Sequence, residues 1–582
     1  MRLLSIQVLN DQYKRSSMVI SIREEIEIPA RGVIRDRHGV ELVVNYPVYD
    51  LMVVAREVKP FDTLLLCRIL DLDHLYVREY LQRQMRDPYL RVNRGVIARQ
   101  LPIDQIGKFT EFQFRFPGFY VQERTMRRYP IGVAAHTLGY IGEVNQGVLD
   151  RDSYYVAGDY IGISGIERSY EGVLRGEKGL RKRLKDKFGR DQGPYLGGEE
   201  DIQARAGLDL YTTLDAGLQA YGEQLMEHKI GSVVALEPST GEILALVTSP
   251  TYDPNLLSGR ERAKNYHTLL NDTYRPLMNR ALQAQYPPGS TFKMVNALIS
   301  MQMNALRAET RYSCGGAFHM GRLTVRCHGH PGPTNLAQSI QFSCNTYYCY
   351  NFRDMLDRSN YPNTKAAFEV WRAHALSFGL GKRFNNDLPF GLAGNIPTSE
   401  FYDRYHGSGR WRALSIISLA IGQGEILTTP VQLANIAAVI ANKGHYFNPH
   451  IVKSIGHPDS LNTAVRERFE TTIDPHHFEP IIIGMRDVVL AGTARNAYIP
   501  GITVCGKTGT AQNPHGDNHS LFIAYAPMEN PQIAIAVIVE NAGYGSTWAS
   551  PIASLMIEKY LTGEVKREAL ENRILNSKLI KR

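Results

Sequence analysis

The spacing of apolar and polar residues predicts short helices and strands in mixed order over the first third of the chain. The predicted strands lie at residues 21–28, 49–55 and 92–101. The predicted helices lie at residues 61–70, 75–85 and 103–114. A further helix at residues 218–228 marks the point where we expect a second domain to begin.

Five strand patterns follow that helix, with a helical region between the second and the third. They lie at residues 232–237, 243–248, 503–512, 521–526 and 532–540. The first two flank Pro238-Ser-Thr-Gly241, a turn-forming sequence, and are expected to form a hairpin. We predict one antiparallel sheet with the strand at 503–512 at its edge.

Composition limits the class of protein. A chain of 582 residues is too long for one core, since domains commonly contain about 150 residues. Apolar residues make up 43% and charged residues 21%, as in folded soluble domains. The net charge of +8 comes with no long arm of like charge, which argues against nucleic acid as a partner. We interpret the basic run at 180–188 as the face of a solvated hairpin.

A serine and a lysine stand together in Gln285-Tyr-Pro-Pro-Gly-Ser-Thr-Phe-Lys293. The prolines and glycine predict a turn, and an apolar helix at residues 290–301 is expected to begin with Ser290. Residues at i and i+3 share a helix face, so the Lys293 amine can reach the Ser290 hydroxyl. A lysine accepts that proton only if burial or nearby positive charge keeps the amine neutral. The motif is short, and it also fits a helix cap followed by a solvated lysine.

Two further motifs follow in order: Ser343-Cys344-Asn345 and Lys507-Thr508-Gly509-Thr510. Ser-x-x-Lys, Ser-x-Asn and Lys-Thr-Gly in this order are typical of penicillin-binding proteins and class A β-lactamases. Cys344 stands where the commonly cited pattern has aspartate. The joint occurrence of the three motifs favours one catalytic site over a cap at Ser343, a turn residue at Asn345 and a surface charge at Lys507.

Signatures outside these motifs narrow the resemblance to one subfamily. They are Ile28-Pro-Ala-Arg-Gly-Val-Ile-Arg-Asp-Arg-His-Gly39, Arg128-Tyr-Pro130, Ala135-His-Thr-Leu-Gly-Tyr140, Gly165-Ile-Glu-Arg168, Leu174-Arg-Gly176, Gly422-Gln-Gly-Glu-Ile-Leu-Thr-Thr-Pro430 and Gly543-Tyr-Gly-Ser-Thr-Trp548. The chain resembles the class B penicillin-binding proteins of the penicillin-binding protein 2 type over nearly its whole length. The resemblance implies an α+β protein with an elongated N-terminal pedestal and a β-lactamase-like transpeptidase domain with a five-stranded antiparallel sheet and flanking helices. We expect the pedestal at residues 1–225 with a head insertion around 57–125, the transpeptidase domain at 226–565 and a C-terminal tail at 566–582.

The same resemblance implies a peptidoglycan D,D-transpeptidase. Ser290 would attack the carbonyl between two D-alanines while Lys293 accepts its proton. Ser343 would pass a proton to the leaving amine, and Asn345 would hydrogen-bond Lys293 and the substrate amide. Backbone amides of Ser290 and Thr510 would hold the oxyanion.

The Lys-Thr-Gly strand would bind the substrate. Lys507 adds positive charge, Thr508 would bind the terminal carboxylate, and Gly509 lets the strand approach the substrate backbone closely. A second amine would then attack the acyl-enzyme and form the crosslink. Two alternatives stay open: a D,D-carboxypeptidase or β-lactamase-type hydrolase, and a non-catalytic β-lactam sensor or assembly scaffold. No carboxylate base for a deacylating water can be assigned, which argues against a β-lactamase.

Four cysteine and histidine residues form a candidate metal site: Cys314, Cys327, His330 and Cys344, spaced C-x12-C-x2-H-x13-C. Cys327 and His330 are close enough in sequence to chelate one ion. Because Cys344 lies between Ser343 and Asn345, a metal would brace their loop. Some penicillin-binding proteins 2 carry zinc beside this motif, so the resemblance supports a structural zinc. A Cys314–Cys327 disulfide, unlinked buried thiols, and His328 as a substitute ligand are the alternatives.

The implied partners are peptidoglycan stem peptides, β-lactams that acylate Ser290, and a membrane glycosyltransferase of the elongation machinery that contacts the pedestal. The chemistry requires no cofactor. The implied place is the inner (cytoplasmic) membrane with the catalytic domain in the periplasm. The sequence holds no apolar run of about 18 residues, the length of a spanning helix. Residues 1–9 resemble the segment that follows the family's anchor, so we expect an anchor before them.

Overall fold

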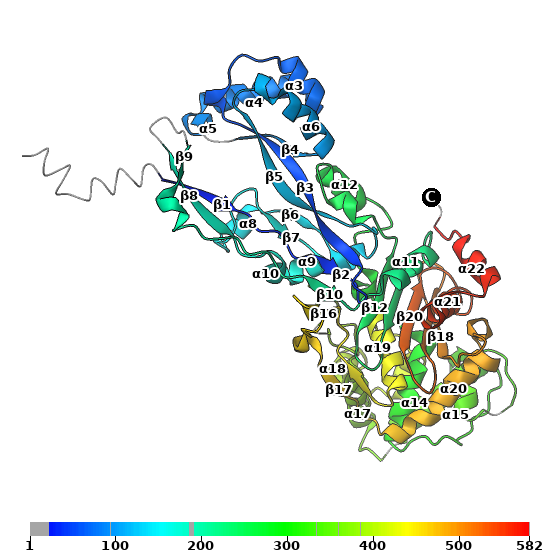
Figure 1. The fold of residues 1–582 in the computed structure, drawn as a ribbon. Coiled ribbons are helices and arrows are strands. Elements are labelled where there is room, and N and C mark those ends of the chain that lie inside the picture. The colour runs from blue at the N-terminus through cyan, green and yellow to red at the C-terminus, as the bar shows by residue number, and fades with distance from the viewer. Residues whose placement is uncertain are drawn as a thin grey trace, which may run out of the picture.

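The computed structural model describes residues 22–92, 95–185, 191–332, 334–358, 360–384 and 386–580, and residues 1–9 lie outside these ranges. Figure 1 shows an elongated lobe built largely from the N-terminal part of the chain and a compact lobe that contains most of the rest. The C-terminal end of the chain lies on the compact lobe. Among the described helices, none combines the length and the apolar character that a bilayer span requires.

A six-stranded sheet runs through the elongated lobe in the order β16-β10-β2-β3-β4, with β5 also paired to β3. Its strands are β2 (Ile34–Arg35), β3 (Glu41–Val53), β4 (Gly95–Leu101), β5 (Phe119–Arg128), β10 (Leu210–Thr212) and β16 (Val452–Ile455). The strand predicted at residues 49–55 is the second half of β3. Pro47 and the half-buried polar Asn45 concealed the first half, because proline is depleted in strands and breaks the alternating pattern.

One strand of this sheet comes from far along the sequence. β16 pairs antiparallel with β10, with Leu210 opposite Ile455, and β10 in turn pairs parallel with β2. The sheet of the elongated lobe therefore includes a strand that the compact lobe's half of the sequence supplies.

A separate cluster of helices caps the far end of the elongated lobe (Figure 1). It contains α3 (Thr63–Leu70), α4 (His74–Arg86), α5 (Pro88–Val92) and α6 (Ile103–Phe112). The three predicted helices correspond to α3, α4 and α6. Asp62 and Asp73 cap α3 and α4 by accepting backbone hydrogen bonds, which stabilises helix starts by about 1 kcal/mol each. This end of the lobe has its own hydrophobic core, which includes Leu66, Phe109 and Phe119 and is separate from the main core.

Buried charges of opposite sign lie together in the base of the elongated lobe. The Arg127 Nε lies 2.7 Å from Glu167 Oε1, and both side chains are fully buried. The Arg31 Nη2 lies 2.6 Å from Glu167 Oε2 and 2.8 Å from Glu171 Oε2. These residues join β5 and the segment before β2 to α9 (Gly165–Ser169) and α10 (Glu171–Leu174). Each buried charge in this network is compensated.

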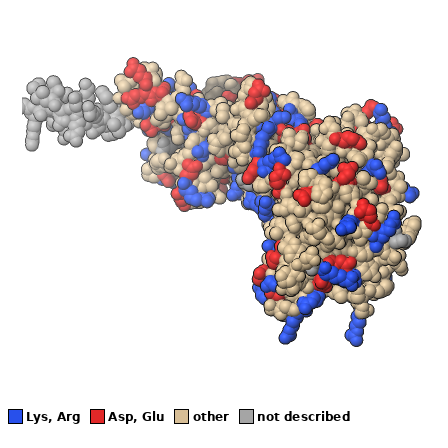
Figure 2. All heavy atoms as spheres, turned by 90° about the horizontal axis from the view of Figure 1, so that it is seen from below, with Lys and Arg blue, Asp and Glu red and all other residues tan. Residues whose placement is uncertain are grey.

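The basic run lies in a three-stranded sheet of the order β1-β8-β9, made of β1 (Ile22–Glu27), β8 (Gly179–Lys185) and β9 (Asp191–Pro194). Arg181 pairs with Glu27 across β1 and β8, and Lys182 pairs with Glu200. The predicted hairpin is therefore present as β8 and β9, and residues 186–188 of the basic run lie outside the described ranges. Figure 2 shows lysine and arginine side chains interspersed with aspartate and glutamate over the face that it displays.

The compact lobe is organised around a five-stranded antiparallel sheet in the order β12-β11-β20-β19-β18, as predicted, with the Lys-Thr-Gly strand at its edge. The strands are β11 (Gly231–Leu236), β12 (Ile243–Ser249), β18 (Cys505–Ala511), β19 (His519–Ala526) and β20 (Ile533–Val539). Every residue of β11, β12 and β20 is buried. Such continuous apolar strands indicate that helices cover both faces of the sheet.

Those helices carry or support the motifs. α11 (Ala216–Leu225) and α21 (Ala549–Thr562) pack together against β12, β19 and β20, and α19 (Pro430–Ala441) and α20 (Phe478–Ala491) pack against β20, β11 and β18. α14 (Lys293–Gln302), α15 (Leu336–Gln341), α16 (Asn345–Asp357) and α17 (Thr364–Ser377) form the helical region between β12 and β18. The remaining elements are β6 (Ile141–Glu143), β7 (Tyr160–Gly162), β13 (Ala317–Met320), β14 (Leu323–Arg326), β15 (His445–Phe447), β17 (Arg468–Glu470), α7 (Ala135–Leu138), α8 (Gln146–Leu149), α12 (Arg262–Leu270), α13 (Arg280–Gln283), α18 (Ser399–His406), α22 (Glu568–Leu575) and short 3₁₀ turns.

Candidate active site

Ser290 lies in a tight turn that packs against the edge strand. The turn is a 3₁₀ segment, Gly289–Phe292, and the α-helix begins at Lys293 rather than at Ser290 as predicted. Gly289 has a φ of +56°, and a Cβ on it would lie 2.6 Å from the Thr510 carbonyl oxygen. The close approach of β18 therefore requires glycine here and forces the tighter turn, which holds Ser290 beside the Lys-Thr-Gly strand.

Lys293 is fully buried at the start of α14. Its Nζ donates to the Ser343 carbonyl oxygen at 2.8 Å and to Asn345 Oδ1 at 2.7 Å, and lies 3.3 Å from Ser343 Oγ. Among the described residues no carboxylate pairs with this amine. Burial therefore lowers the pKa of Lys293 to about 8, which favours the neutral amine that a general base requires. In the described part of the chain, no hydrogen bond joins the Lys293 amine to the Ser290 hydroxyl.

A second buried lysine, Lys507, also contacts Ser343. The Lys507 Nζ donates to Ser343 Oγ at 2.8 Å and to the Thr508 carbonyl oxygen at 3.0 Å. Burial, and after it the neighbouring Lys293, hold the pKa of Lys507 well below its usual range. Ser343 itself has a φ of +57°, a strained conformation for a non-glycine residue. This conformation places the Ser343 hydroxyl within hydrogen-bond reach of both amines, so the hydroxyl can pass a proton between them and a bound substrate.

A cleft of about 450 Å³ opens over these groups. It is lined by Ser290, His328, Ser343, Asn345, Ile421, Gln423, Thr493, Thr508, Thr510, Gln512, Asn518, Tyr544, Gly545 and Ser546. A Cβ on Gly509 would meet the Thr291 methyl group at 2.9 Å, so glycine lets the strand lie against the Ser290 turn. The three motifs predicted from the sequence thus come together in one cleft.

Other residues that line the cleft were not predicted as site residues from the sequence. Gln423 and Tyr544 fall inside segments that were recognised only as family signatures. Thr493 carries no motif at all, yet its Oγ1 lies 2.8 Å from Thr508 Oγ1. The one signal for it is a Gly-Thr pair directly after an apolar helical pattern, which predicts a helix end and not a binding residue.

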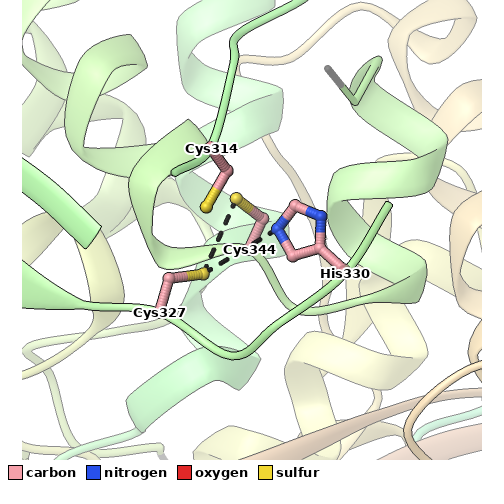
Figure 3. A group of neighbouring side chains, drawn as sticks. All are labelled: Cys314, Cys327, His330 and Cys344. Carbon is pink, nitrogen blue, oxygen red and sulfur yellow. Dashed lines mark hydrogen bonds between the residues drawn. The ribbon is translucent and has the colours of Figure 1, made fainter. Parts of the chain in front are cut away.

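Figure 3 shows the side chains of the cysteine and histidine cluster turned toward one another. The ligand atoms of Cys314, Cys327, His330 and Cys344 all lie within 4.8 Å of one another. Cys327 Sγ is 3.8 Å from Cys344 Sγ and 3.9 Å from His330 Nε2. All six cysteines are free, so the Cys314–Cys327 disulfide is not formed. His328 lines the cleft and is not a member of the cluster.

The donor set of the cluster fits a tetrahedral zinc site, since three thiols and one imidazole converge. The contact between the two thiols lowers the pKa of Cys327, which the backbone amides at the start of α16 lower further, and raises the pKa of Cys344. Cys327 is therefore the thiol of the pair that ionises first. The Asn345 backbone N–H donates to Cys327 Sγ at 3.2 Å, and the Asn345 side-chain amide donates to the Arg326 carbonyl oxygen at 2.8 Å. Cys327 of the cluster therefore holds the backbone of Asn345, and the neighbouring Arg326 holds its side chain.

Comparison with family models gives two matches that divide the chain as its fold does. Residues 231–558 match the penicillin-binding protein transpeptidase domain, and residues 26–212 match the penicillin-binding protein dimerisation domain. The first match alone includes the Ser290, Ser343 and Lys507 motifs and the whole five-stranded sheet.

Relatives and solved structures agree with these matches. The chain is 33% identical to the peptidoglycan D,D-transpeptidase MrdA of Acinetobacter baumannii, over 95% of this chain and 83% of the relative, and 31% identical to that of Escherichia coli, over 89% and 84%. It is similar in fold to Pseudomonas aeruginosa PBP2 in complex with WCK 5153, with a TM-score of 0.69, 27% identity and coverage of 94% and 99%. It is also similar to a chain of a peptidoglycan synthase complex that coordinates polymerization and crosslinking, with a TM-score of 0.75, 26% identity and coverage of 97% and 96%.

Two buried lysines on one serine, an edge strand beside a serine turn, and matches over both lobes lead to the same assignment. The chain belongs to the class B penicillin-binding proteins of the penicillin-binding protein 2 type, with a dimerisation-type pedestal and a serine transpeptidase domain.

Proposed function

We propose that this protein crosslinks peptidoglycan stem peptides through a Ser290 acyl-enzyme. The convergence of the buried Lys293 and Lys507 amines on Ser343, beside Ser290 in one cleft, carries the proposal. Ser290 Oγ attacks the carbonyl between two D-alanines and its proton passes to Lys293. The peptide C–N bond breaks as Ser343 delivers a proton to the leaving amine and takes one from Lys293, whose Nζ lies 3.3 Å from Ser343 Oγ. An acceptor amine then attacks the ester, Lys293 accepts its proton, and a proton passes on to Ser290 Oγ as the C–O bond of the ester breaks.

The other motif residues support these steps. Asn345 accepts from Lys293 and lines the cleft, so it positions the base beside the substrate amide. Thr510 lies against the Ser290 turn, so the backbone amides of both residues serve as the oxyanion site. Thr508 binds the terminal carboxylate of the substrate, and Gly509 permits the close approach of the substrate backbone.

Intact mass spectrometry with a fluorescent penicillin tests this function, comparing wild type with Ser290→Ala. We expect one covalent adduct on wild type that persists for hours and none on the variant. An adduct lost within minutes would indicate a hydrolase, that is, a D,D-carboxypeptidase or β-lactamase. Absence of any adduct on wild type would favour the sensor or scaffold alternative. A complementation assay of Ser290→Ala for rod shape then tests the role in wall elongation.

The same proposal includes the division of the chain and its setting. Residues 1–225 form the pedestal with its head around 57–125, residues 226–565 the transpeptidase domain, and 566–582 the tail. The separate core of the head supports an insertion there. The similar chain belongs to a peptidoglycan synthase complex in which polymerization and crosslinking are coordinated, and this supports a polymerising enzyme as a partner. The partner that we propose is a membrane glycosyltransferase that contacts the pedestal, at the cytoplasmic membrane with the catalytic domain in the periplasm. Co-purification with and without residues 57–125 tests the contact.

Cys314, Cys327, His330 and Cys344 would hold one structural zinc ion. A bound zinc would supply a rigid crosslink behind Ser343 and Asn345 and no step of the acyl transfer. We expect elemental analysis to find one zinc per chain, and cobalt substitution to give the absorption of thiolate ligation, both lost in Cys327→Ser. Cys67→Ser in α3 is the matched control and should keep the metal. Equal metal content in wild type, Cys327→Ser and Cys67→Ser would contradict a metal site at this cluster.

A further inference from the structure

Thr493 stands where a helix end meets the edge strand of the cleft. It follows Gly492 at the end of α20 and lines the cleft together with Ser343 and Asn345. Its Oγ1 lies 2.8 Å from Oγ1 of Thr508, and either hydroxyl can be the donor in that bond. Thr508 is 8% exposed as a residue and lines the same cleft.

The position of Thr493 is fixed by the protein around it. A Cβ on Gly492 would lie 2.5 Å from the Gln341 carbonyl oxygen, so the turn passes directly against the end of α15. The Gln341 side-chain amide donates to the Ala491 carbonyl oxygen at 3.3 Å, and the Ala494 N–H donates to the Val488 carbonyl oxygen at 3.0 Å. α15 leads directly into the Ser343 motif. The turn therefore holds Thr493 in register with both the Ser343 loop and β18.

The chemistry of the two hydroxyls gives this contact a direction. A hydroxyl has one proton to donate and two lone pairs that accept. A carboxylate accepts only, so a carboxylate bound at Thr508 requires that Thr508 give its proton to the ligand. The bond between the hydroxyls must then run from Thr493 to Thr508. Such a chain of donors polarises the last hydroxyl and strengthens its bond to the anion. No arginine stands among the described residues that line the cleft, which leaves hydroxyl donors to meet the anion beside Lys507.

We propose that Thr493 is a positioning residue for carboxylate recognition: it donates to Thr508, orients that hydroxyl toward the cleft, and thereby selects substrates and inhibitors with a terminal carboxylate. The inference rests on the proposed function, because it needs Ser290 to be acylated. It adds to that function a residue that selects the ligand without touching the acyl-transfer atoms.

Acylation kinetics test the inference with two variants and two probes. The variants are Thr493→Val, which keeps the shape and removes the donor, and Thr493→Ser, which keeps the donor. The probes are benzylpenicillin and its methyl ester, whose carbonyl accepts only a weaker, uncharged bond. With benzylpenicillin, we expect Thr493→Val to lower the second-order acylation rate constant about tenfold, through weaker binding with an unchanged limiting rate. Thr493→Ser should stay near wild type, and the ester should lose no more than about twofold in either variant.

Thermal unfolding of both variants controls for the fold, and Thr493→Ser controls for the space that the side chain fills. The inference is overturned if Thr493→Val reacts with benzylpenicillin as wild type does, or if acid and ester lose the same factor. Wild type without any adduct would overturn the proposed function, and this inference with it. Wild type with a stable adduct and no acid-specific loss in Thr493→Val would overturn the inference alone.

Discussion

The buried charges of the pedestal and those of the cleft obey the same electrostatics with opposite results. In the pedestal, Arg127 and Arg31 meet Glu167 at 2.7 and 2.6 Å, and although burial raises the pKa of Glu167, the two arginines lower it overall. In the cleft, Lys293 and Lys507 are equally buried, yet their partners are a serine and an amide.

Compensation decides which buried charge is structural and which is chemical. A buried ion pair keeps both groups charged at ordinary pH, so the network in the pedestal joins strands and helices without changing its protonation. A buried amine without a carboxylate loses its proton readily, and two such amines beside one another oppose each other's charge. The cleft can therefore move protons where the pedestal cannot.

The largest effect is expected for Lys293→Met, which should abolish the chemistry of the cleft with little loss of stability. Because the substitution removes the base, we expect the rate of acylation by penicillin to fall about 10⁴-fold, or about 5 kcal/mol in activation free energy. The free energy of unfolding should change by only about 1 kcal/mol, since the lost amine was an uncompensated buried group. Stopped-flow acylation and urea unfolding measure the two quantities. A variant that acylates within tenfold of wild type would exclude Lys293 as the base.

Arg127→Met should have the reverse effect in the pedestal. It leaves Glu167 buried with a weaker set of partners, and we expect the free energy of unfolding to fall by about 4 kcal/mol. Acylation by the protein that remains folded at low temperature should match wild type. Unfolding by urea and acylation at the same temperature give both values. Unchanged stability would show that the network does not hold the lobe together.

The pH dependence of acylation sharpens the same contrast. Burial places the pKa of Lys293 at about 8, and only the neutral amine accepts the serine proton. The rate should therefore rise about tenfold from pH 7 to pH 9 and level off above that. Glu167, whose pKa is lowered overall, stays charged throughout this range. A flat profile between pH 7 and pH 9 would mean that another group limits the reaction.

The smallest change in the free energy of unfolding is expected for an exposed ion pair. The side chains of Arg205 and Glu177 are 80% and 72% exposed and lie 3.5 Å apart. Glu177→Gln should change the free energy of unfolding by no more than about 0.5 kcal/mol, because water screens the pair. Urea unfolding beside Arg127→Met makes the comparison direct, and a loss of several kcal/mol here would undo the argument from burial.

Local signals explain what could be predicted from the sequence. Ser290 and Lys293 are separated by one helical turn, and the strands of the compact lobe are short apolar runs bounded by turns, so both are visible without knowledge of the fold. The geometry of the Ser290 turn was not visible, because it depends on Thr510, which is more than two hundred residues away. A glycine that must admit a distant strand has no periodic signature.

Long-range placement explains what was missed. Thr493 is recognisable as a site residue only when α20 brings it to Thr508. The half of β3 before Pro47 is a strand because it pairs with β2 and β5. The cysteine spacing predicted the correct cluster but left its chemistry open. Free thiols and converging side chains excluded the disulfide once the loop geometry was available.

The crossing of β16 into the pedestal sheet limits how this protein can be divided. A fragment that begins after residue 225 keeps β16 but loses β10 (Leu210–Thr212), the strand with which β16 pairs. The fragment would display an unpaired strand edge, which is a template for aggregation. Ile34 and Leu210 also share one core with the sheet of the compact lobe. A soluble catalytic fragment for inhibitor screening should therefore retain residues 30–50 and 205–215, joined by a short linker, rather than begin at the family-model boundary.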